Sequence, residues 1–194
     1  MLSNTNNQHP KRITLSKIQP ILSRTDLSGN IRYCNPYFSE VCGYTEKELL
    51  GSPHSIIRHP DMPKVIFKLM WKRIQNNEDM LAIVKNKTKN GDYYWVTTLF
   101  ETKYHPYTKK HEGYLALRRA APDDAIRDIE PLYKKLVEIE ASEGMDASEA
   151  YFLNFLREQD KDYDTYVKEL TQYRGLVAAF FNSVRKLLHH GDSA

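Results

Sequence analysis

Residues 80–120 read MLAIVKNKTKNGDYYWVTTLFETKYHPYTKKHEGYLALRRA, a stretch of three apolar and aromatic segments separated by two polar turns. The turns are KNGD at 89–92 and PYTKK at 106–110. An Asn-Gly or Gly-Asp pair between apolar segments is typical of a β-hairpin. We therefore predict three consecutive antiparallel strands, and this arrangement excludes a repeating parallel β-α-β fold.

The middle segment, residues 92–106, alternates with a period of two residues. One set is Tyr94, Val96 and Thr98, and the other is Tyr93, Trp95 and Thr97. A period of two places the two sets on opposite faces of a sheet. The alternation therefore predicts a sheet with one buried face.

Residues 20–35, PILSRTDLSGNIRYCN, predict two earlier strands joined by a turn. Residues 36–75 predict several short helices, marked by Pro36 in a first turn and by Thr45 and Glu48 as a capping box. Two and three strands separated by helices combine most economically into one sheet. We expect an α+β fold, a five-stranded antiparallel sheet with short helices on one face, followed by a C-terminal helical extension.

The segment 56–71, IIRHPDMPKVIFKLMW, places three ionisable side chains before an amphipathic helix. Asp61 is at a position typical of an N-cap, and Arg58 with Asp61 equally fits a surface ion pair. Arg58 and the N–H groups that open the helix also suit a phosphate. The residues alone leave these interpretations open. A metal site at His54 and His59 is disfavoured, because the prolines at 53 and 60 prevent a shared helix.

The chain divides into three parts by its patterning. Residues 1–20 form an N-terminal arm. The segment ITLSKIQPILS, residues 13–23, fits either a short helix or an extended segment. Residues 21–121 contain the predicted sheet. Residues 122–194 are charged and helical, with a break at 142–144 followed by one or two more helices. Because an amphipathic helix needs a surface to pack on, we expect this extension to serve dimerisation, docking or output.

The bulk properties exclude several classes of protein. The net charge of +3 is too small to indicate nucleic-acid binding. The two cysteines, Cys34 and Cys42, form no CxxC pair, and with no visible signal peptide they predict a reduced, cytoplasmic protein. No apolar run is long enough to span a bilayer, so we expect no direct membrane insertion. No GxSxG, P-loop or HExxH motif occurs, so we predict that the chain is not an enzyme.

Four segments together resemble a PAS domain: DLSGNIRYCNPYFSEVCGYTEKELLG, RHPDMPKVIFKLMW, VKNKTKNGDYYWV and GYLALRR. The resemblance covers about residues 20–136. GYTEKELLG and KNGDYYWV are common to many PAS domains and identify the fold. The RHPDMPKVIFKLMW segment is more specific, and it is similar to the FAD-binding PAS domain of bacterial energy-taxis receptors of the Aer type.

This resemblance implies a cytoplasmic sensor of redox and energy state that holds FAD noncovalently. By motif, Arg58, His59 and Asp61 match residues needed for flavin retention, Asn35, Phe67 and Asn86 match the pocket lining, and Trp71 and Trp95 match aromatic positions. Reduction of the flavin would change the hydrogen bonding of Asn86, and the sheet would pass this change to the flanking helices. A stand-alone sensor, expected as a homodimer, would dock onto a chemoreceptor-type signalling protein, which could recruit it to the membrane.

One strand departs from the family pattern. Met80 and Ala82 stand where the family often has Trp and Gly. This favours an alternative, a cofactor-free PAS module for protein–protein interaction. A sensor of heme or another small ligand is a third alternative, although no axial histidine stands on the central helix. The absence of a cysteine from IIRHPDMP excludes the adduct photochemistry of light-sensing flavin PAS domains.

Overall fold

The computed structural model describes residues 9–105, 107–172 and 176–191, and these residues form an α+β fold. In chain order the elements are β1 (Ile21–Thr25), β2 (Ile31–Cys34), α1 (Pro36–Cys42), α2 (Glu46–Leu49), the 3₁₀ helix η1 (His54–Ile57), α3 (Lys64–Gln75), β3 (Met80–Lys87), β4 (Tyr93–Tyr104), β5 (His111–Ala120), α4 (Asp123–Ser142), α5 (Met145–Glu158), α6 (Tyr163–Leu170) and α7 (Leu176–Gly191).

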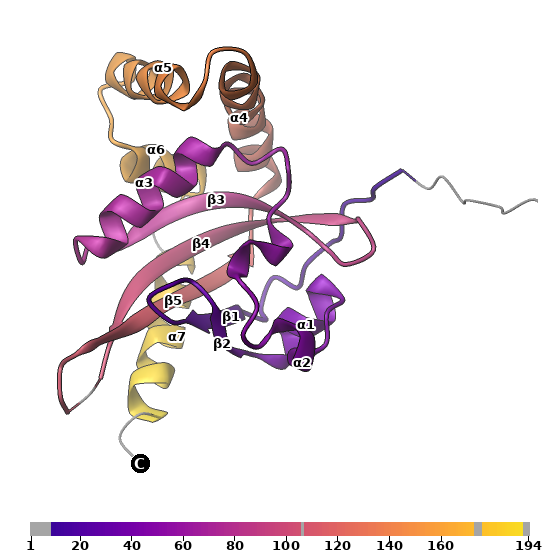
Figure 1. Cartoon of the computed structure of the whole chain (residues 1–194), viewed down its shortest axis with the longest axis vertical. Coiled ribbons are helices and arrows are strands. Elements are labelled where there is room, and N and C mark those ends of the chain that lie inside the picture. The colour runs from indigo at the N-terminus through magenta and orange to yellow at the C-terminus, as the bar shows by residue number, and fades with distance from the viewer. Residues whose placement is uncertain (1–8, 106, 173–175, 192–194) are drawn as a thin grey trace, which may run out of the picture.

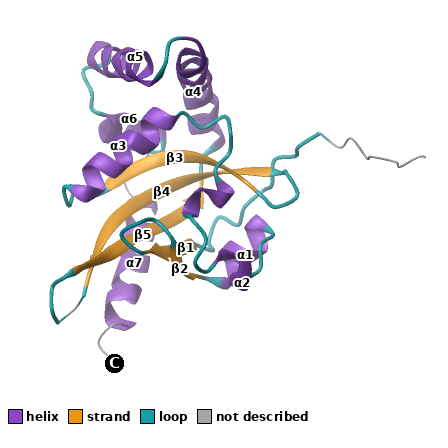
Figure 2. Cartoon of the chain, in the orientation of Figure 1, coloured by secondary structure: helices purple, strands orange, loops and turns teal. Residues whose placement is uncertain are grey.

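The five strands form one antiparallel sheet in the order β2-β1-β5-β4-β3 (Figures 1 and 2). The hairpins β3–β4 and β4–β5 confirm the prediction from residues 80–120. Gly91 has φ +95° in the first turn, and Lys109 has φ +55° in the second. Because β1 lies between β2 and β5, the first and last strands of the sheet are neighbours in its middle.

Helices cover both faces of the sheet. As predicted, the short helices η1 and α3 lie on one face, together with α1 and α2 (Figure 1). The alternation in β4 predicted that the other face would be exposed, but the helical extension covers it. Trp95 stacks on Tyr133 of α4 at 6.3 Å, and Arg119 lies 5.3 Å from the Phe180 ring of α7. The sheet is therefore buried on both sides.

The cap signals around the short helices are confirmed. The Asn35 side chain accepts a hydrogen bond from Phe38 N, and α1 ends at Gly43, whose φ is +72°. Thr45 and Glu48 form the predicted capping box at the start of α2. These local signals fix the chain path that leads into η1.

The extension begins at α4 and breaks after Ser142, as predicted, but it continues as three helices instead of one or two. Gly144, two residues after the end of α4, has φ +94°, a conformation that does not continue a helix. Asp162 caps α6 by accepting from Thr165 N at 2.7 Å. Among the described residues, no helix is both long and apolar enough to cross a membrane.

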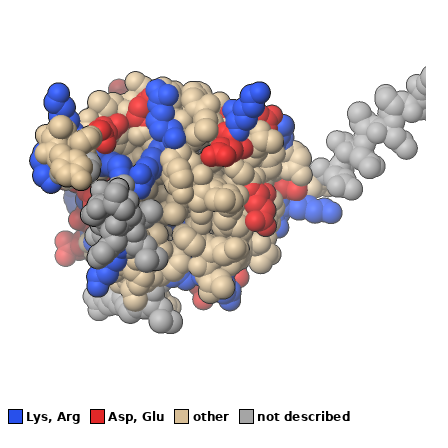
Figure 3. Space-filling view, turned by 90° about the horizontal axis from the view of Figure 1, so that it is seen from below, with Lys and Arg blue, Asp and Glu red and all other residues tan. Residues whose placement is uncertain are grey.

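The N-terminal arm is extended, not helical, where it is described. Arg12 bridges Tyr93 in a parallel arrangement, and Ile13 N donates to Tyr93 O at 2.7 Å. Residues 1–8 of the predicted arm lie outside the described residues, as do 192–194 of the predicted extension. On the face shown in Figure 3, basic and acidic side chains are interspersed, in keeping with the small net charge.

The Tyr133 hydroxyl ties α4 to the sheet. It donates to Ile83 O at 2.8 Å and also contacts the Tyr163 hydroxyl, and all these groups are buried. We expect Tyr133→Phe to lower the free energy of unfolding by about 1–2 kcal/mol, because it leaves buried polar groups without a partner. Urea unfolding of this variant should be compared with Tyr151→Phe, whose ring is exposed on α5. Equal stability of the two variants would contradict the role of this bond.

Candidate ligand-binding pocket

A cavity of about 290 Å³ lies between the sheet and the η1–α3 segment. Its lining comes from β1, the β1–β2 turn, η1, α3, β3, β4 and β5. The lining includes the side chains of Ser23, His54, Arg58, Phe67, Trp71, Asn86, Tyr114 and Arg118. The volume is close to the lower end of the range of ligand pockets, about 300–1,000 Å³.

Aromatic rings form one wall of this cavity. The Trp71 ring meets Tyr114 edge-on at 5.4 Å, and the Arg58 guanidinium lies 3.8 Å from the centroid of Phe67. Gly29, with φ +83°, stands directly against Trp71, and a Cβ at this position would lie 3.1 Å from Trp71 Cη2. A glycine in the β1–β2 turn therefore makes room for the indole.

A buried cation forms the polar end. Arg118 is 2% exposed, and its Nη1 donates to Ser23 Oγ at 3.0 Å and to Ala116 O at 3.3 Å. Its Nη2 donates to His54 Nε2 at 2.7 Å. Burial, followed by the charge of Arg118, holds the pKa of His54 well below its usual value. His54 is therefore a neutral imidazole that accepts through Nε2 and carries its proton on Nδ1.

Two further donors on this lining have no partner. Asn86 Nδ2 and Arg58 Nε are buried without a hydrogen bond. Asn86 lies directly across from Tyr94 on the neighbouring strand, and the Tyr94 hydroxyl is likewise buried without a hydrogen bond of normal geometry. Because buried donors without acceptors are costly, the cavity is suited to a ligand that carries acceptor atoms.

The structure brings together only part of the set that the sequence predicted. Arg58, Phe67, Trp71 and Asn86 all line the cavity. Asn35, His59, Asp61 and Trp95 do not line it. Met80 and Ala82, the departures from the family pattern, are fully buried on β3 and also lie outside the lining.

Asn35 is committed to the backbone around α1. Its Oδ1 accepts from Leu22 N at 3.0 Å and from Phe38 N at 3.2 Å, and its Nδ2 donates to Pro20 O at 2.8 Å. These three bonds use the hydrogen-bonding groups that a flavin edge would need. The residue positions β1 against α1 and so supports the pocket from outside.

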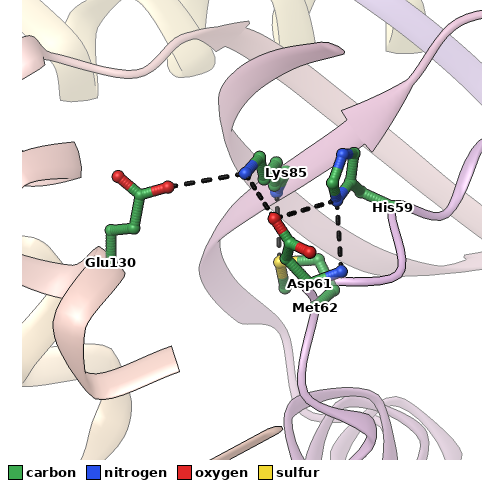
Figure 4. A network of polar contacts seen from close by, with 5 residues as sticks. All are labelled: His59, Asp61, Met62, Lys85 and Glu130. Carbon is green, nitrogen blue, oxygen red and sulfur yellow. Dashed lines mark hydrogen bonds and ion pairs between the residues drawn. The ribbon is translucent and has the colours of Figure 1, made fainter. Parts of the chain in front are cut away.

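The ionisable side chains of the 56–71 segment point in different directions, some toward α4 and one into the cavity. Asp61 pairs with Lys85 at 2.7 Å, and Lys85 also reaches Glu130 of α4 at 3.4 Å (Figure 4). His59 Nδ1 lies 3.5 Å from Asp61. Asp61 thus faces α4, while Arg58 turns into the cavity, so the Arg58–Asp61 ion pair considered from the sequence is not formed.

The start of α3 corrects two expectations. The helix begins at Lys64 after Pro63, so Asp61 is not its N-cap. The N–H groups of Lys64 and Val65 donate to the Glu140 carboxylate at 3.0 and 2.9 Å. The anion that this helix N-terminus binds is therefore a side chain of α4, and the predicted phosphate position is occupied by it.

Sequence reasoning missed the polar end of the pocket. It considered His54 only as a metal ligand, and among the described residues no group of three His, Cys, Asp or Glu side chains could hold a metal. Arg118 lies in β5 on the same face as Ala116 and Tyr114, two and four residues earlier. This period of two was a signal that could have identified a buried arginine.

The PAS fold family model matches residues 31–111, from β2 to the start of β5, and this range contains η1, α3 and the β3–β4 hairpin. The chain contains a PAS domain. This PAS domain is similar to the aerotaxis receptor of Escherichia coli, with 44% identity over 118 residues, which are 60% of this chain and 22% of the receptor. The resemblance to the aerotaxis-receptor type is therefore confirmed.

Another curated protein is also similar to this chain. The nitrogen fixation regulatory protein of Klebsiella pneumoniae is 28% identical over 98 residues, 50% of this chain and 20% of that protein. The chain thus spans about a fifth of the length of these curated relatives.

Two solved structures also match the PAS domain. The PAS domain of a Colwellia psychrerythraea protein has 20% identity and a TM-score of 0.47, covering 52% of this chain and 85% of that one. A light-oxygen-voltage domain structure concerned with a flavin analogue has 19% identity and a TM-score of 0.49, covering 60% and 86%.

Proposed function

We propose that this PAS domain is a redox sensor, which binds FAD noncovalently in the cavity and relays the redox state of the flavin to a chemotaxis-type signalling partner. The proposal is supported by the similarity to the aerotaxis receptor and by the chemistry of the pocket. The observation that carries it is the combination of an aromatic wall with buried, unpartnered donors.

The residues present fit the flavin ring. Trp71 and Phe67 offer apolar surface, while Asn86 and Arg118 offer donors for the oxygen and nitrogen atoms of a uracil-like edge. A volume of about 290 Å³ suits the ring system and not a whole dinucleotide, so the rest of FAD would lie outside the enclosed space. When bound, the flavin would supply reversible electron uptake coupled to a change of charge or protonation.

Strand β3 is the proposed route from the pocket to the output. Asn86 faces the cavity, and the preceding residue, Lys85, faces α4 and contacts Glu130. Ile83 O of the same strand accepts from Tyr133 of α4. A change in the hydrogen bonding of Asn86 would therefore alter the strand that holds α4. We assign output to the extension, residues 122–194, through docking to the partner or to a second copy.

The visible spectrum of freshly purified protein tests the proposal. We expect a yellow protein that dithionite bleaches, or an apoprotein that takes up added FAD. Trp71→Leu should weaken FAD binding at least tenfold, because it removes most of one wall. Trp95→Leu is the matched control, since Trp95 lies on the other face against Tyr133, and it should retain FAD. A colourless wild-type protein that takes up no FAD would instead favour the cofactor-free interaction module.

A further inference from the structure

Arg118 is a buried cation, and the groups that its guanidinium contacts are all neutral. Its guanidinium contacts the Ser23 hydroxyl, the Ala116 carbonyl, the His54 imidazole and, at 5.6 Å, the Phe38 ring. No carboxylate of the described residues forms an ion pair with it. Burial, opposed by the influence of Tyr94 and Cys42, lowers the pKa of Arg118 to about 10, so the side chain stays cationic at neutral pH.

A buried cation without a counter-ion is expensive, and proteins normally pair it. The neighbours of Arg118 satisfy hydrogen bonds but supply no negative charge. His54 is held neutral, and its protonation would place a second cation 2.7 Å away. Because Arg118 lines the cavity, a bound ligand is the remaining source of the missing charge.

We propose that Arg118 is the counter-charge of the pocket, which makes the domain bind reduced flavin more tightly than oxidised flavin and so sets the potential at which the sensor switches. This inference rests on the proposed function. When bound, the flavin would accept electrons from an external reductant such as dithionite. Where no proton accompanied an electron, the Arg118 guanidinium would offset the added negative charge.

Ser23 and His54 act as positioning residues for Arg118. Ser23 approaches the guanidinium from β1 and His54 approaches it from η1. The Ser23 Oγ also lies 3.1 Å from His54 Nε2. Together they hold the cation against the sheet without neutralising it. The charge is therefore kept available for whatever enters the cavity.

The test compares the FAD affinity of the oxidised protein with that of the protein kept reduced by dithionite without oxygen. In Arg118→Gln, the ratio of reduced to oxidised affinity should fall at least tenfold, which corresponds to about 59 mV for a one-electron couple and about 30 mV for a two-electron couple. A redox titration against indicator dyes should show the same shift. Arg118→Met gives a second reading if the glutamine variant does not fold.

Arg119→Gln is the matched control, because it removes the same charge from the next residue, which lies against α7 on the other face of the sheet. Its affinity ratio should equal that of the wild type. A wild type that binds FAD and an Arg118→Gln variant with an unchanged ratio would overturn the inference alone. A wild type that takes up no FAD in either state would overturn the proposed function as well.

The flavin-free proteins provide an independent measurement. Without a ligand the Arg118 charge is uncompensated, so Arg118→Met should melt at the same temperature as the wild type or above it. Saturating FAD under reducing conditions should reverse this order, because only the wild type gains from the added charge. A variant that melts lower than the wild type without ligand, and by the same margin with reduced FAD, would show that Arg118 is structural.

Discussion

Gly113→Ala is expected to lower the free energy of unfolding by more than about 3 kcal/mol, because there is no room for a side chain at this position. A Cβ on Gly113 would lie 1.8 Å from the carbonyl oxygen of Thr25 and 2.9 Å from its carbonyl carbon. Both are backbone atoms at the end of β1, so no flexible side chain can move aside. The φ of +153° is also rare for a residue that has a Cβ.

Gly91→Ala measures the cost of a positive φ without a steric clash. Gly91 also has a positive φ, +95°, but a Cβ there meets no atom within 4 Å. We expect it to cost only about 1 kcal/mol, the penalty of the conformation itself. Urea unfolding, followed by circular dichroism, measures both variants. Equal losses would show that the contact between Gly113 and Thr25 relaxes without cost.

Acidification from pH 6.5 to pH 5 is expected to destabilise the domain by about 2 kcal/mol through His54. The unfolded chain binds a proton at this residue below about pH 6.5, its ordinary pKa. The folded state keeps the imidazole neutral, because burial and the charge of Arg118 lower its pKa. Acid therefore favours the unfolded state by up to about 1.4 kcal/mol per pH unit, and well above pH 6.5 the contribution of His54 is constant.

His54→Gln should remove most of this slope, since the glutamine oxygen can still accept from Arg118 but does not titrate. His59, whose pKa is lowered chiefly by burial, contributes a smaller slope of the same sign. His9→Gln, at an exposed histidine of the arm, is the control and should keep the wild-type slope. Urea midpoints between pH 5 and pH 8 give the comparison. A His54→Gln slope that matches the wild type would contradict the neutral state of His54.

The elements that were predicted correctly from the sequence are those determined by residues close together along the chain. The hairpins around Gly91 and residues 106–110, and the capping box of Thr45 and Glu48, are specified within a few residues. The amphipathic pattern that follows Asp61 also predicted the helix α3. The coverage of the second face depends on how residues 122–191 fold back, and no local pattern contains that information.

The polar details of the site were harder to predict because their partners are far away in sequence. Asp61 was assigned to a helix cap or to Arg58, and its actual partner, Lys85, lies 24 residues later. The start of α3 was assigned to a phosphate, and the actual acceptor is Glu140, 75 residues after Val65. Motif matching placed Phe67, Trp71, Asn86 and Arg58 at the cavity, but it gave no reason to choose Arg118.

The position of β1 between β2 and β5 also determines when the pocket can exist during biosynthesis. Ser23 and Arg118, which are hydrogen-bonded in the pocket, are 95 residues apart. At a synthesis rate of about 5–20 residues per second, β1 leaves the ribosome about 5–20 s before β5, its neighbour in the middle of the sheet. During that interval the nascent chain exposes Ile21 and Leu22, which are buried in the finished domain. The pocket is therefore completed only after β5 has been made, and no ligand can bind in it before that point.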